Sequence, residues 1–302
     1  MSEAVAGTGP VVVGFNGSPS GDDALTLGQI CSRVLGVPLV AAVVHPSPAV
    51  ISPARVDAEG VADRRRAAEE TLDRARERLA SMPGPGADAE FRIAASSSAA
   101  HGLHDIAEEV GASLLVVGSR SGGPAERLFA GSTAERLLSG SSSPVAVAPA
   151  GLHERPPTEL GRIGVAYIDT PEARAALALA VQLAHRVSAE LRLYTIVAEE
   201  ADMLPLGIFR DAERVFVAGA REEYRKALEA AIAELPDGVR ATGHIVTGEV
   251  VESLSERVAE EVDVLFCGSR GYGPVRRVFL GGVSSRLIRR ARCPVVVVPR
   301  GD

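Results

Sequence analysis

Short apolar runs alternate with longer segments of helical period along the whole chain, a pattern typical of strands joined by crossover helices. In the first half, the apolar runs predict strands at about 10–16, 37–45, 89–95, 113–118 and 144–148. Because each strand is followed by a helical segment before the next strand, the strands are expected to be parallel. The pattern predicts an α/β fold.

The segment 59–81 shows why the intervening pieces are expected to be helices. Its apolar residues recur at steps of seven, four, three and four on one face: Val61, Ala68, Leu72, Ala75 and Leu79. The other face carries the charged sequences ADRRR and DRARER and is expected to be solvated. The corresponding stripe in the second half consists of Tyr224, Leu228, Ile232 and Leu235. Glycine and proline at 82–86 and 235–238 are expected to end the two helices.

The chain contains two copies of one unit. Residues 115–120 read LVVGSR and residues 265–270 read LFCGSR, an offset of 150. The same offset relates PVAVAP at 144–149 to PVVVVP at 294–299, and an offset of 152 relates the opening strands. A repeat of this length predicts two domains of the same fold, at 1–150 and 160–302.

The segment between the copies is polar and rich in proline, so residues 150–161 are expected to form a surface linker. The last apolar runs of the copies, 145–148 and 295–298, would invite pairing if they were open sheet edges. We expect them to pair with each other and to form a pseudo-dimer within one chain. The sequence leaves open whether this pseudo-dimer associates into a further homodimer.

Composition narrows the class of protein. With 302 residues, 46% of them hydrophobic and 24% charged, the chain is expected to be globular and not disordered. The net charge of −7 argues against nucleic acid as a partner, because no long basic cluster offsets it. No apolar window is long enough to span a membrane, so we expect a cytoplasmic protein with no membrane partner. The three cysteines contain no CxxC pair and suggest neither disulfides nor zinc.

The candidate chemistry lies in two glycine-spaced loops. In open α/β sheets, ligands bind beyond the carboxyl ends of the strands where the strand order reverses. The turn after the first strand, 14–18, and the loops GSRSGGPAERLFAGST from Gly118 and GSRGYGPVRRVFLGGVSS from Gly268 are expected there. Glycines allow close approach of the backbone, and helix N-termini favour anions, so a phosphate is the expected ligand. The Walker, GxGxxG and GxSxG signatures are absent from the sequence.

These loops resemble those of the universal stress protein family. Its nucleotide-binding members carry a glycine, two residues, a second glycine, nine residues, and then a glycine followed by Ser or Thr. The first copy matches with Gly118, Gly131 and Ser132 but has Ser121 at the second glycine position. The second copy has its three glycines at 268, 271 and 281, but Gly282 stands where the hydroxyl is expected. The resemblance covers nearly the whole chain and is that of a tandem member.

The resemblance implies a five-stranded parallel sheet in the order 3-2-1-4-5 in each copy, with helices on both faces. It also implies that ATP binds between the first and fourth strands. The choice among ATP, ADP and AMP is left open, as is the presence of magnesium as an accompanying ion. Nucleotide-binding members carry an aspartate at the end of the first strand, where this chain has Asn16 and Ile168. Asn16 retains hydrogen-bonding capacity and Ile168 does not, while Asp169 lies one residue out of register.

The candidate nucleotide-binding residues follow from this resemblance. In the first copy they are Gly14, Phe15, Asn16, His45, Val117, Gly118, Arg120, Ser121, Gly131, Ser132 and Thr133. In the second copy they are Ala166, Tyr167, Val197, Cys267, Gly268, Arg270, Gly271, Gly281, Gly282, Val283 and Ser284. We expect the first copy to be the better nucleotide site.

Two other motifs are better explained without a catalytic or metal-binding role. His101, His104 and Asp105 have a spacing that suits two metal ligands, but no further ligand is evident and a solvated helix start is favoured. The apolar stretch 203–209 is expected to cover the pocket or to contact a partner protein that the sequence does not identify.

No set of general base, nucleophile and orienting group can be assembled, so fast catalysis is not expected. The resemblance implies a stress-response regulatory module that binds an adenine nucleotide. The alternative is an interaction protein with degenerate, nucleotide-free pockets, and slow ATP hydrolysis is left open.

Overall fold

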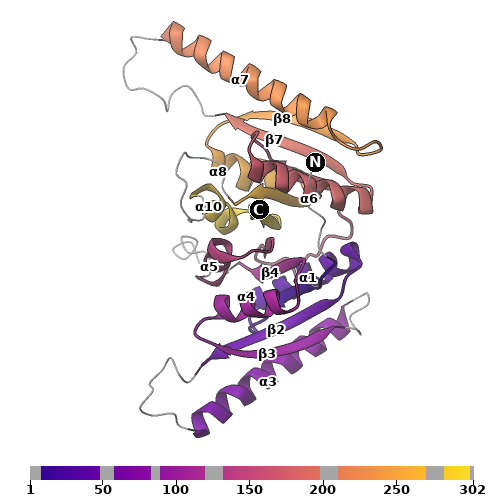
Figure 1. Cartoon of the computed structure of the whole chain (residues 1–302), viewed down its shortest axis with the longest axis vertical. Helices are drawn as coiled ribbons and strands as arrows, with labels where there is room; N and C mark the ends of the chain where they lie inside the picture. The colour runs from indigo at the N-terminus through magenta and orange to yellow at the C-terminus, as the bar shows by residue number, and fades with distance from the viewer. Residues whose placement is uncertain are drawn as a thin grey trace. The chain divides into compact units, whose positions relative to one another are not determined.

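The computed structural model describes residues 8–47, 58–82, 89–119, 132–197, 210–269 and 282–299. These residues fall into two compact units, the first ending at Thr158 and the second beginning at Glu159. Figure 1 shows that each unit contains strands flanked by helices. The two units are described separately below.

The first unit is built on five parallel strands in the order β3-β2-β1-β4-β5. The strands are β1 (Val11–Gly14), β2 (Leu39–Pro46), β3 (Glu90–Ser96), β4 (Leu114–Gly118) and β5 (Val145–Ala148). Their order confirms the prediction, and their bounds lie within two residues of it. The strand order reverses between β1 and β4, where Val11 pairs with both Leu39 and Leu114.

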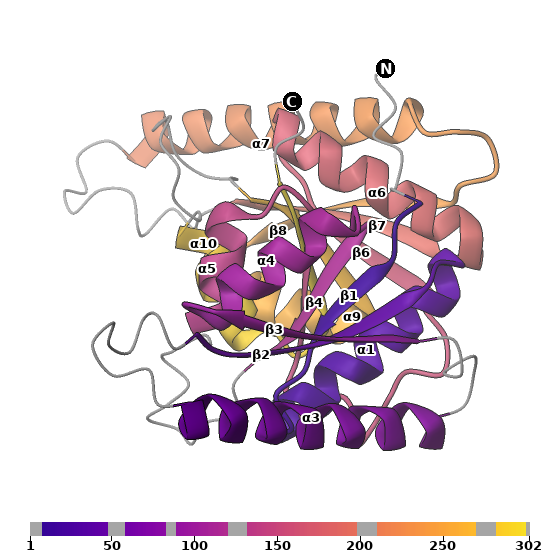
Figure 2. The ribbon, with the colours of Figure 1, turned by 60° about the horizontal axis from the view of Figure 1, so that its bottom comes forward.

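Helices cover both faces of this sheet. They are α1 (Pro19–Leu35), α3 (Ala58–Ser81), α4 (Ala99–Glu109) and α5 (Ser132–Gly140). Helix α1 contacts α3, while α4 contacts α5, and Figure 2 shows α3 and α4 on opposite sides of β2 and β3. Because the central strands are covered twice, Val11, Val12, Val13, Leu115 and Val116 are fully buried.

The second unit repeats this arrangement in the order β8-β7-β6-β9-β10. Its strands are β6 (Arg162–Ala166), β7 (Glu190–Val197), β8 (Ala241–Thr247), β9 (Val264–Gly268) and β10 (Val295–Val298). Its helices are α6 (Pro171–Val187), α7 (Arg210–Ala233), α8 (Val250–Glu252), α9 (Ala259–Glu261) and α10 (Gly282–Arg290). A π-helical segment, Ser253–Val258, joins α8 to α9, and the sequence pattern did not predict it.

The helix after the first strand begins in the same way in both units. Ser18 and Thr170 occupy the N-cap positions, and Pro19 and Pro171 follow as the first helical residues, where a missing N–H costs nothing. The Thr170 hydroxyl accepts a hydrogen bond from the Ala173 N–H at 3.2 Å. These turns direct both helix N-termini to the carboxyl ends of the strands.

None of the helices in the described part of the chain is long and apolar enough to cross a membrane. The pairing of 145–148 with 295–298 stays a prediction. The segment 203–209 lies outside the described residues.

Candidate functional site

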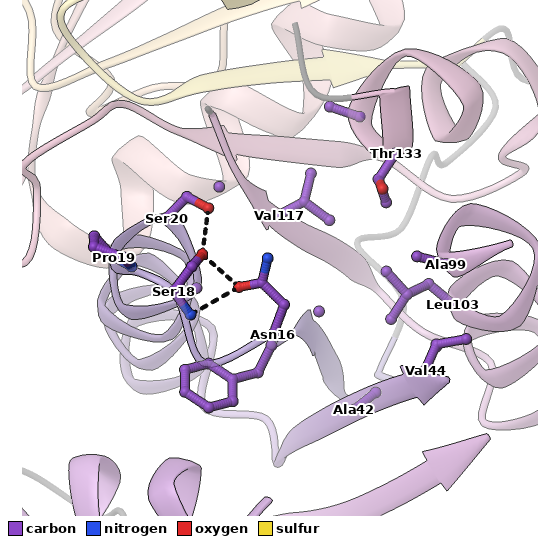
Figure 3. Close-up of a pocket in the computed structure, with 15 residues that line it drawn as sticks. Asn16, Ser18, Pro19, Ser20, Ala42, Val44, Ala99, Leu103, Val117 and Thr133 are labelled. Carbon is purple, nitrogen blue, oxygen red and sulfur yellow. Dashed lines mark hydrogen bonds between the residues drawn. The ribbon is translucent and has the colours of Figure 1, made fainter. Parts of the chain in front are cut away.

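A cavity of about 560 Å³ opens at the carboxyl ends of β1, β2 and β4 in the first unit. Figure 3 shows that it lies between the start of α1 on one side and the starts of α4 and α5 on the other. Its volume is within the range of small-molecule sites, roughly 300–1,000 Å³. It occupies the point where the strand order reverses, as predicted for this fold.

The cavity is lined by both polar and apolar side chains. The polar side chains are Asn16, Ser18, Ser20 and Thr133, and the apolar ones include Ala42, Val44, Leu103 and Val117. No residue on the described lining carries an ionisable side chain. A ligand with both an apolar and a strongly polar part would fit such a lining.

The turn after β1 is held by the side chain of Asn16. Its Oδ1 accepts hydrogen bonds from the Ser18 N–H at 3.1 Å and from the Ser18 hydroxyl at 2.6 Å. Because a backbone N–H can only donate, the amide oxygen must face Ser18 and the amide nitrogen must face away from it. Figure 3 shows this nitrogen pointing into the cavity. Asn16 therefore offers a hydrogen-bond donor to a ligand.

The N-terminus of α1 packs directly on the end of β4. A Cβ atom added at Gly118 would collide with the carbonyl oxygen of Ser20 and lie 3.0 Å from the Ser20 Cβ. Glycine is therefore required at 118 for α1 to approach this closely. The Ser20 hydroxyl is 2.9 Å from that of Ser18, so both hydroxyls lie at the same side of the cavity.

The acidic residues near the start of α1 are engaged away from this cavity. Asp22 lies 3.7 Å from Arg78 of α3. Asp23 is 1% exposed, and its carboxylate accepts hydrogen bonds from the N–H groups of Gly151 and His153. Neither residue lines the cavity. The partial positive charge of the α1 N-terminus thus remains available to an anionic ligand.

The structure brings together six of the residues predicted for the first copy. Gly14, Phe15, Asn16, Val117, Gly118 and Thr133 all line the cavity. His45 does not line it, and its Nδ1 is 3.2 Å from the Pro46 carbonyl oxygen. Ser132 is the first residue of α5. Arg120, Ser121 and Gly131 lie outside the described residues.

Sequence reasoning missed several lining residues, namely Pro19, Ser20, Gly21, Ala42, Val44, Ala99, Leu103 and Ala134. Two signals were available for some of them. Ala42 and Val44 are two apart on one strand and so share a face. Ser20 follows Ser18 and Pro19 in a sequence typical of a helix start.

In the second unit, the predicted residues that the structure describes lie at the ends of β6, β7 and β9 and at the start of α10. Cys267 is buried, and this burial raises the pKa of its thiol to about 12. The Ser284 hydroxyl donates to the Gly268 carbonyl oxygen at 3.1 Å, and Val283 precedes it in α10. The Val197 carbonyl oxygen accepts from the Gly248 N–H. Gly282 begins α10, while Arg270, Gly271 and Gly281 lie outside the described residues.

The turn after β6 differs from its counterpart in the first unit. Ala166 ends the strand, and Tyr167 is buried, which together with nearby Asp169 raises the pKa of its phenol. Asp169 accepts a hydrogen bond from Arg174 Nε at 2.6 Å, and this contact lowers the pKa of its carboxyl. Asp169, considered above as a substitute for the family aspartate, is thus paired within its own unit.

The histidines of α4 lie on a helix surface. The Ser98 side chain caps the helix by accepting from the His101 N–H at 3.2 Å. His101 and His104 lie 3.8 Å and 3.2 Å from Asp105 and Glu108, each four residues further along the helix. In the described residues, no group of three or more His, Cys, Asp and Glu side chains could hold a metal ion.

Sequence and structure comparisons agree on one family. The model of the family described as the universal stress protein family matches residues 8–149 and again 159–299. Universal stress protein Rv2319c of Mycobacterium tuberculosis is 29% identical over 294 residues, which cover 96% of this chain and 99% of that protein. A universal stress protein structure from Archaeoglobus fulgidus covers 99% of both chains with a TM-score of 0.66 and 21% identity.

A functionally unknown protein from Pseudomonas aeruginosa has the same fold. Its structure covers 99% of this chain and 95% of its own, with a TM-score of 0.64 and 16% identity.

Proposed function

The chain belongs to the universal stress protein family as a tandem member, and on this premise we propose that its first unit binds ATP or a related adenine nucleotide. The observation that carries the proposal is the cavity of about 560 Å³ between β1 and β4, with its mixed polar and apolar lining. The family resemblance of the loop after β4 supports it.

The lining suits the parts of a nucleotide. Ala42, Val44 and Leu103 offer an apolar surface to a flat base. Asn16 offers an amide donor to the base or the sugar, and the Ser18 and Ser20 hydroxyls lie beside it. The N-terminus of α1 and the hydroxyl of Thr133 would favour the phosphates.

Magnesium fits this site only as a companion of the nucleotide. Protein-bound Mg²⁺ is usually held by one or two carboxylates together with phosphate oxygens. The described lining contains hydroxyls but no carboxylate. A magnesium ion would therefore be held mainly by the phosphates and by water.

We assign this binding to a regulatory role in the cytoplasm, in the response to stress, and not to fast catalysis. The described lining has no residue that can act as a general base at neutral pH. Nucleotide occupancy would act by favouring one conformation or assembly, which requires only a difference in affinity between the two states. The protein partner that reads this difference is left unassigned.

Calorimetric titration of the nucleotide-stripped chain with ATP and magnesium tests the proposal. Ala99 is exposed at the start of α4 and lines the cavity, so Ala99→Glu places a bulky negative charge in the cavity of an anionic ligand while remaining compatible with a helix start. We expect this variant to bind ATP about tenfold more weakly or worse, equivalent to about 1.4 kcal/mol.

The matched control is Ala80→Glu, the same substitution at an exposed position of α3 that does not line the cavity. It should bind ATP as the unmodified chain does. Absence of binding by the unmodified chain at millimolar ATP would favour the alternative, an interaction protein with nucleotide-free pockets.

A further inference from the structure

Ser20 and Glu172 occupy the same place in the two units. Each is the second residue of the helix that follows the first strand, after Pro19 and Pro171 respectively. Each also packs against the glycine that ends the fourth strand. A Cβ added at Gly118 would lie 3.0 Å from the Ser20 Cβ, and one added at Gly268 would lie 2.7 Å from the Glu172 Cβ. The second unit thus carries a carboxylate where the first has a cavity-lining hydroxyl.

Most of the surface of Glu172 is covered at this position. The residue is 9% exposed, and no described residue forms a hydrogen bond or ion pair with its carboxylate. Arg174, the nearby cation on the same helix, pairs with Asp169 at 2.6 Å. The charge of Glu172 is therefore not offset by a side chain in the described part of the unit.

The position at a helix N-terminus explains how this charge is tolerated. A carboxylate in the first turn of a helix is stabilised by the partial positive charge of the N–H groups there. The same partial charge is what attracts a phosphate to a helix start. Glu172 therefore places a carboxylate of the chain itself at the position of α6 where α1 has the cavity-lining Ser20 hydroxyl.

Two further polar groups of the first cavity are replaced by apolar side chains in the second unit. Ile168 stands in the place of Asn16, and Val283 in that of Thr133. The hydroxyl of Thr170, at the place of Ser18, is used to cap α6. These changes remove hydrogen bonds, whereas Glu172 adds a repulsive charge.

We infer that Glu172 excludes nucleotide phosphates from the second unit, so that the chain binds one nucleotide, in the first unit. This inference rests on the function proposed above and adds a specificity-determining residue to it. The two units then have different roles: one responds to the nucleotide and the other does not.

Exchange of the two side chains tests the inference in the full chain. Ser20→Glu places the carboxylate of the second unit in the first, and Ser20→Gln places a neutral side chain of the same size there. Position 20 lies in the first turn of a helix, as position 172 does, so both variants are expected to fold. Circular dichroism and the midpoint of unfolding check this. We expect the dissociation constant for ATP to be at least tenfold higher for Ser20→Glu than for Ser20→Gln. Equal constants would overturn the inference.

The reverse exchange tests whether Glu172 itself prevents the second unit from binding ATP. Ile168→Asn with Val283→Thr restores two polar groups but keeps Glu172, and we expect one ATP per chain. Adding Glu172→Ser should raise the stoichiometry to two. A second site in the variant that keeps Glu172, or one site in the variant that lacks it, would contradict the inference.

The number of ATP molecules bound by the unmodified chain distinguishes a failure of this inference from a failure of the proposed function. One ATP per chain, bound about tenfold more weakly or worse by Ala99→Glu, supports both. Two sites per chain overturn the role of Glu172 and leave nucleotide binding intact. No binding overturns the proposed function itself.

Discussion

The side chains of Asp23 and His153 are joined by a hydrogen bond of 2.6 Å although 130 residues separate them in the chain. The ionised carboxylate can only accept, so the His153 Nδ1–H donates. The same carboxylate accepts from the N–H groups of Gly151 at 3.1 Å and His153 at 2.9 Å. Asp23 thus ties α1, whose first turn lines the cavity, to the segment that leaves β5.

The Asp23 contacts predict a large loss of stability on Asp23→Ala. The substitution leaves two backbone N–H groups without their acceptor beside a nearly fully buried position. Hydrogen bonds to charged groups contribute about 1.5–3 kcal/mol each, so we expect the free energy of unfolding of the first unit to fall by about 3 kcal/mol. Urea unfolding, followed by hydrogen exchange of residues 151–158, measures this loss.

Asp22 provides the matched control on the same helix. Its carboxylate is partly exposed and lies 3.7 Å from Arg78, a contact of the kind that contributes about 0–1 kcal/mol. Asp22→Ala should therefore cost much less than Asp23→Ala and should leave hydrogen exchange at 151–158 unchanged. Equal losses would show that the contacts of Asp23 with the segment after β5 are not stabilising.

The orientation of Asn16 predicts which ligand groups the cavity prefers. The amide oxygen is engaged by Ser18, so Asn16 can only donate to a ligand. Asn16→Asp would keep the turn but present an acceptor instead. A methoxy group in place of a ribose hydroxyl can accept but cannot donate. We therefore expect methylation of the contacted hydroxyl to weaken ATP binding several-fold more in Asn16→Asp than in the unmodified chain.

Titration of both proteins with ATP, 2′-O-methyl-ATP and 3′-O-methyl-ATP measures this difference. The bulk of the methyl group is the same in both proteins and cancels in the comparison. Equal losses for both analogues would place Asn16 away from the sugar. Asn16→Ala serves as the reference for loss of the turn, at about 1 kcal/mol of stability.

The fold class could be predicted from the sequence because it depends on long-range regularities. The repeat and the alternation of apolar runs with helical segments indicated the fold class, and the helix predicted at 59–81 is observed as α3 (Ala58–Ser81). The family resemblance supplied the order 3-2-1-4-5. Such patterns can be recognised in a sequence because every strand and helix must bury one apolar face.

The cavity was predicted less completely because its lining depends on side-chain direction and packing. Glycine spacing pointed to Gly14 and Gly118, but Ala42, Val44 and Leu103 resemble ordinary core residues in the sequence. The role of Glu172 needed the contact of α6 with Gly268, which no local pattern reveals. The hydrogen bonds of Asp23 were also missed, because an acidic residue near a helix start is usually explained by the helix dipole.

The close approach of α1 to β4 predicts a large effect of Gly118→Ala. The new Cβ would collide with the Ser20 backbone oxygen, which cannot rotate away as a side chain can. We expect a loss of about 1–3 kcal/mol in the free energy of unfolding, as for other overpacked sites, together with weaker ATP binding.

Gly140→Ala is the control for this substitution. A Cβ at Gly140, in α5, would have no heavy atom within 4 Å, so alanine should be neutral or stabilise by about 0.5–1 kcal/mol. A Gly118→Ala variant as stable as Gly140→Ala would contradict the packing of Ser20 on Gly118. Denaturant unfolding of both variants decides between these outcomes.

The burial of Cys267 predicts how the stability of the second unit depends on pH. Burial raises the pKa of this thiol from 9.0 to about 12, so the folded state favours the protonated form. The protonated thiol makes its full contribution to the free energy of unfolding below pH 9, which is the pKa of the thiol in the unfolded chain. This contribution is lost as the pH rises from 9 towards 12. Each pH unit in this window should cost about 1.4 kcal/mol.

Cys267→Val removes the titrating group and keeps a strand-forming side chain of similar size. We expect the free energy of unfolding to fall between pH 8 and pH 10 by about 1 kcal/mol less in this variant than in the unmodified chain. Alkylation gives an independent measurement: at pH 8 the native thiol should react roughly a thousandfold more slowly than a free cysteine, because only the thiolate reacts. Rapid native labelling of Cys267, identified by mass spectrometry, would show that the thiol is accessible and ionised, contrary to its burial in β9.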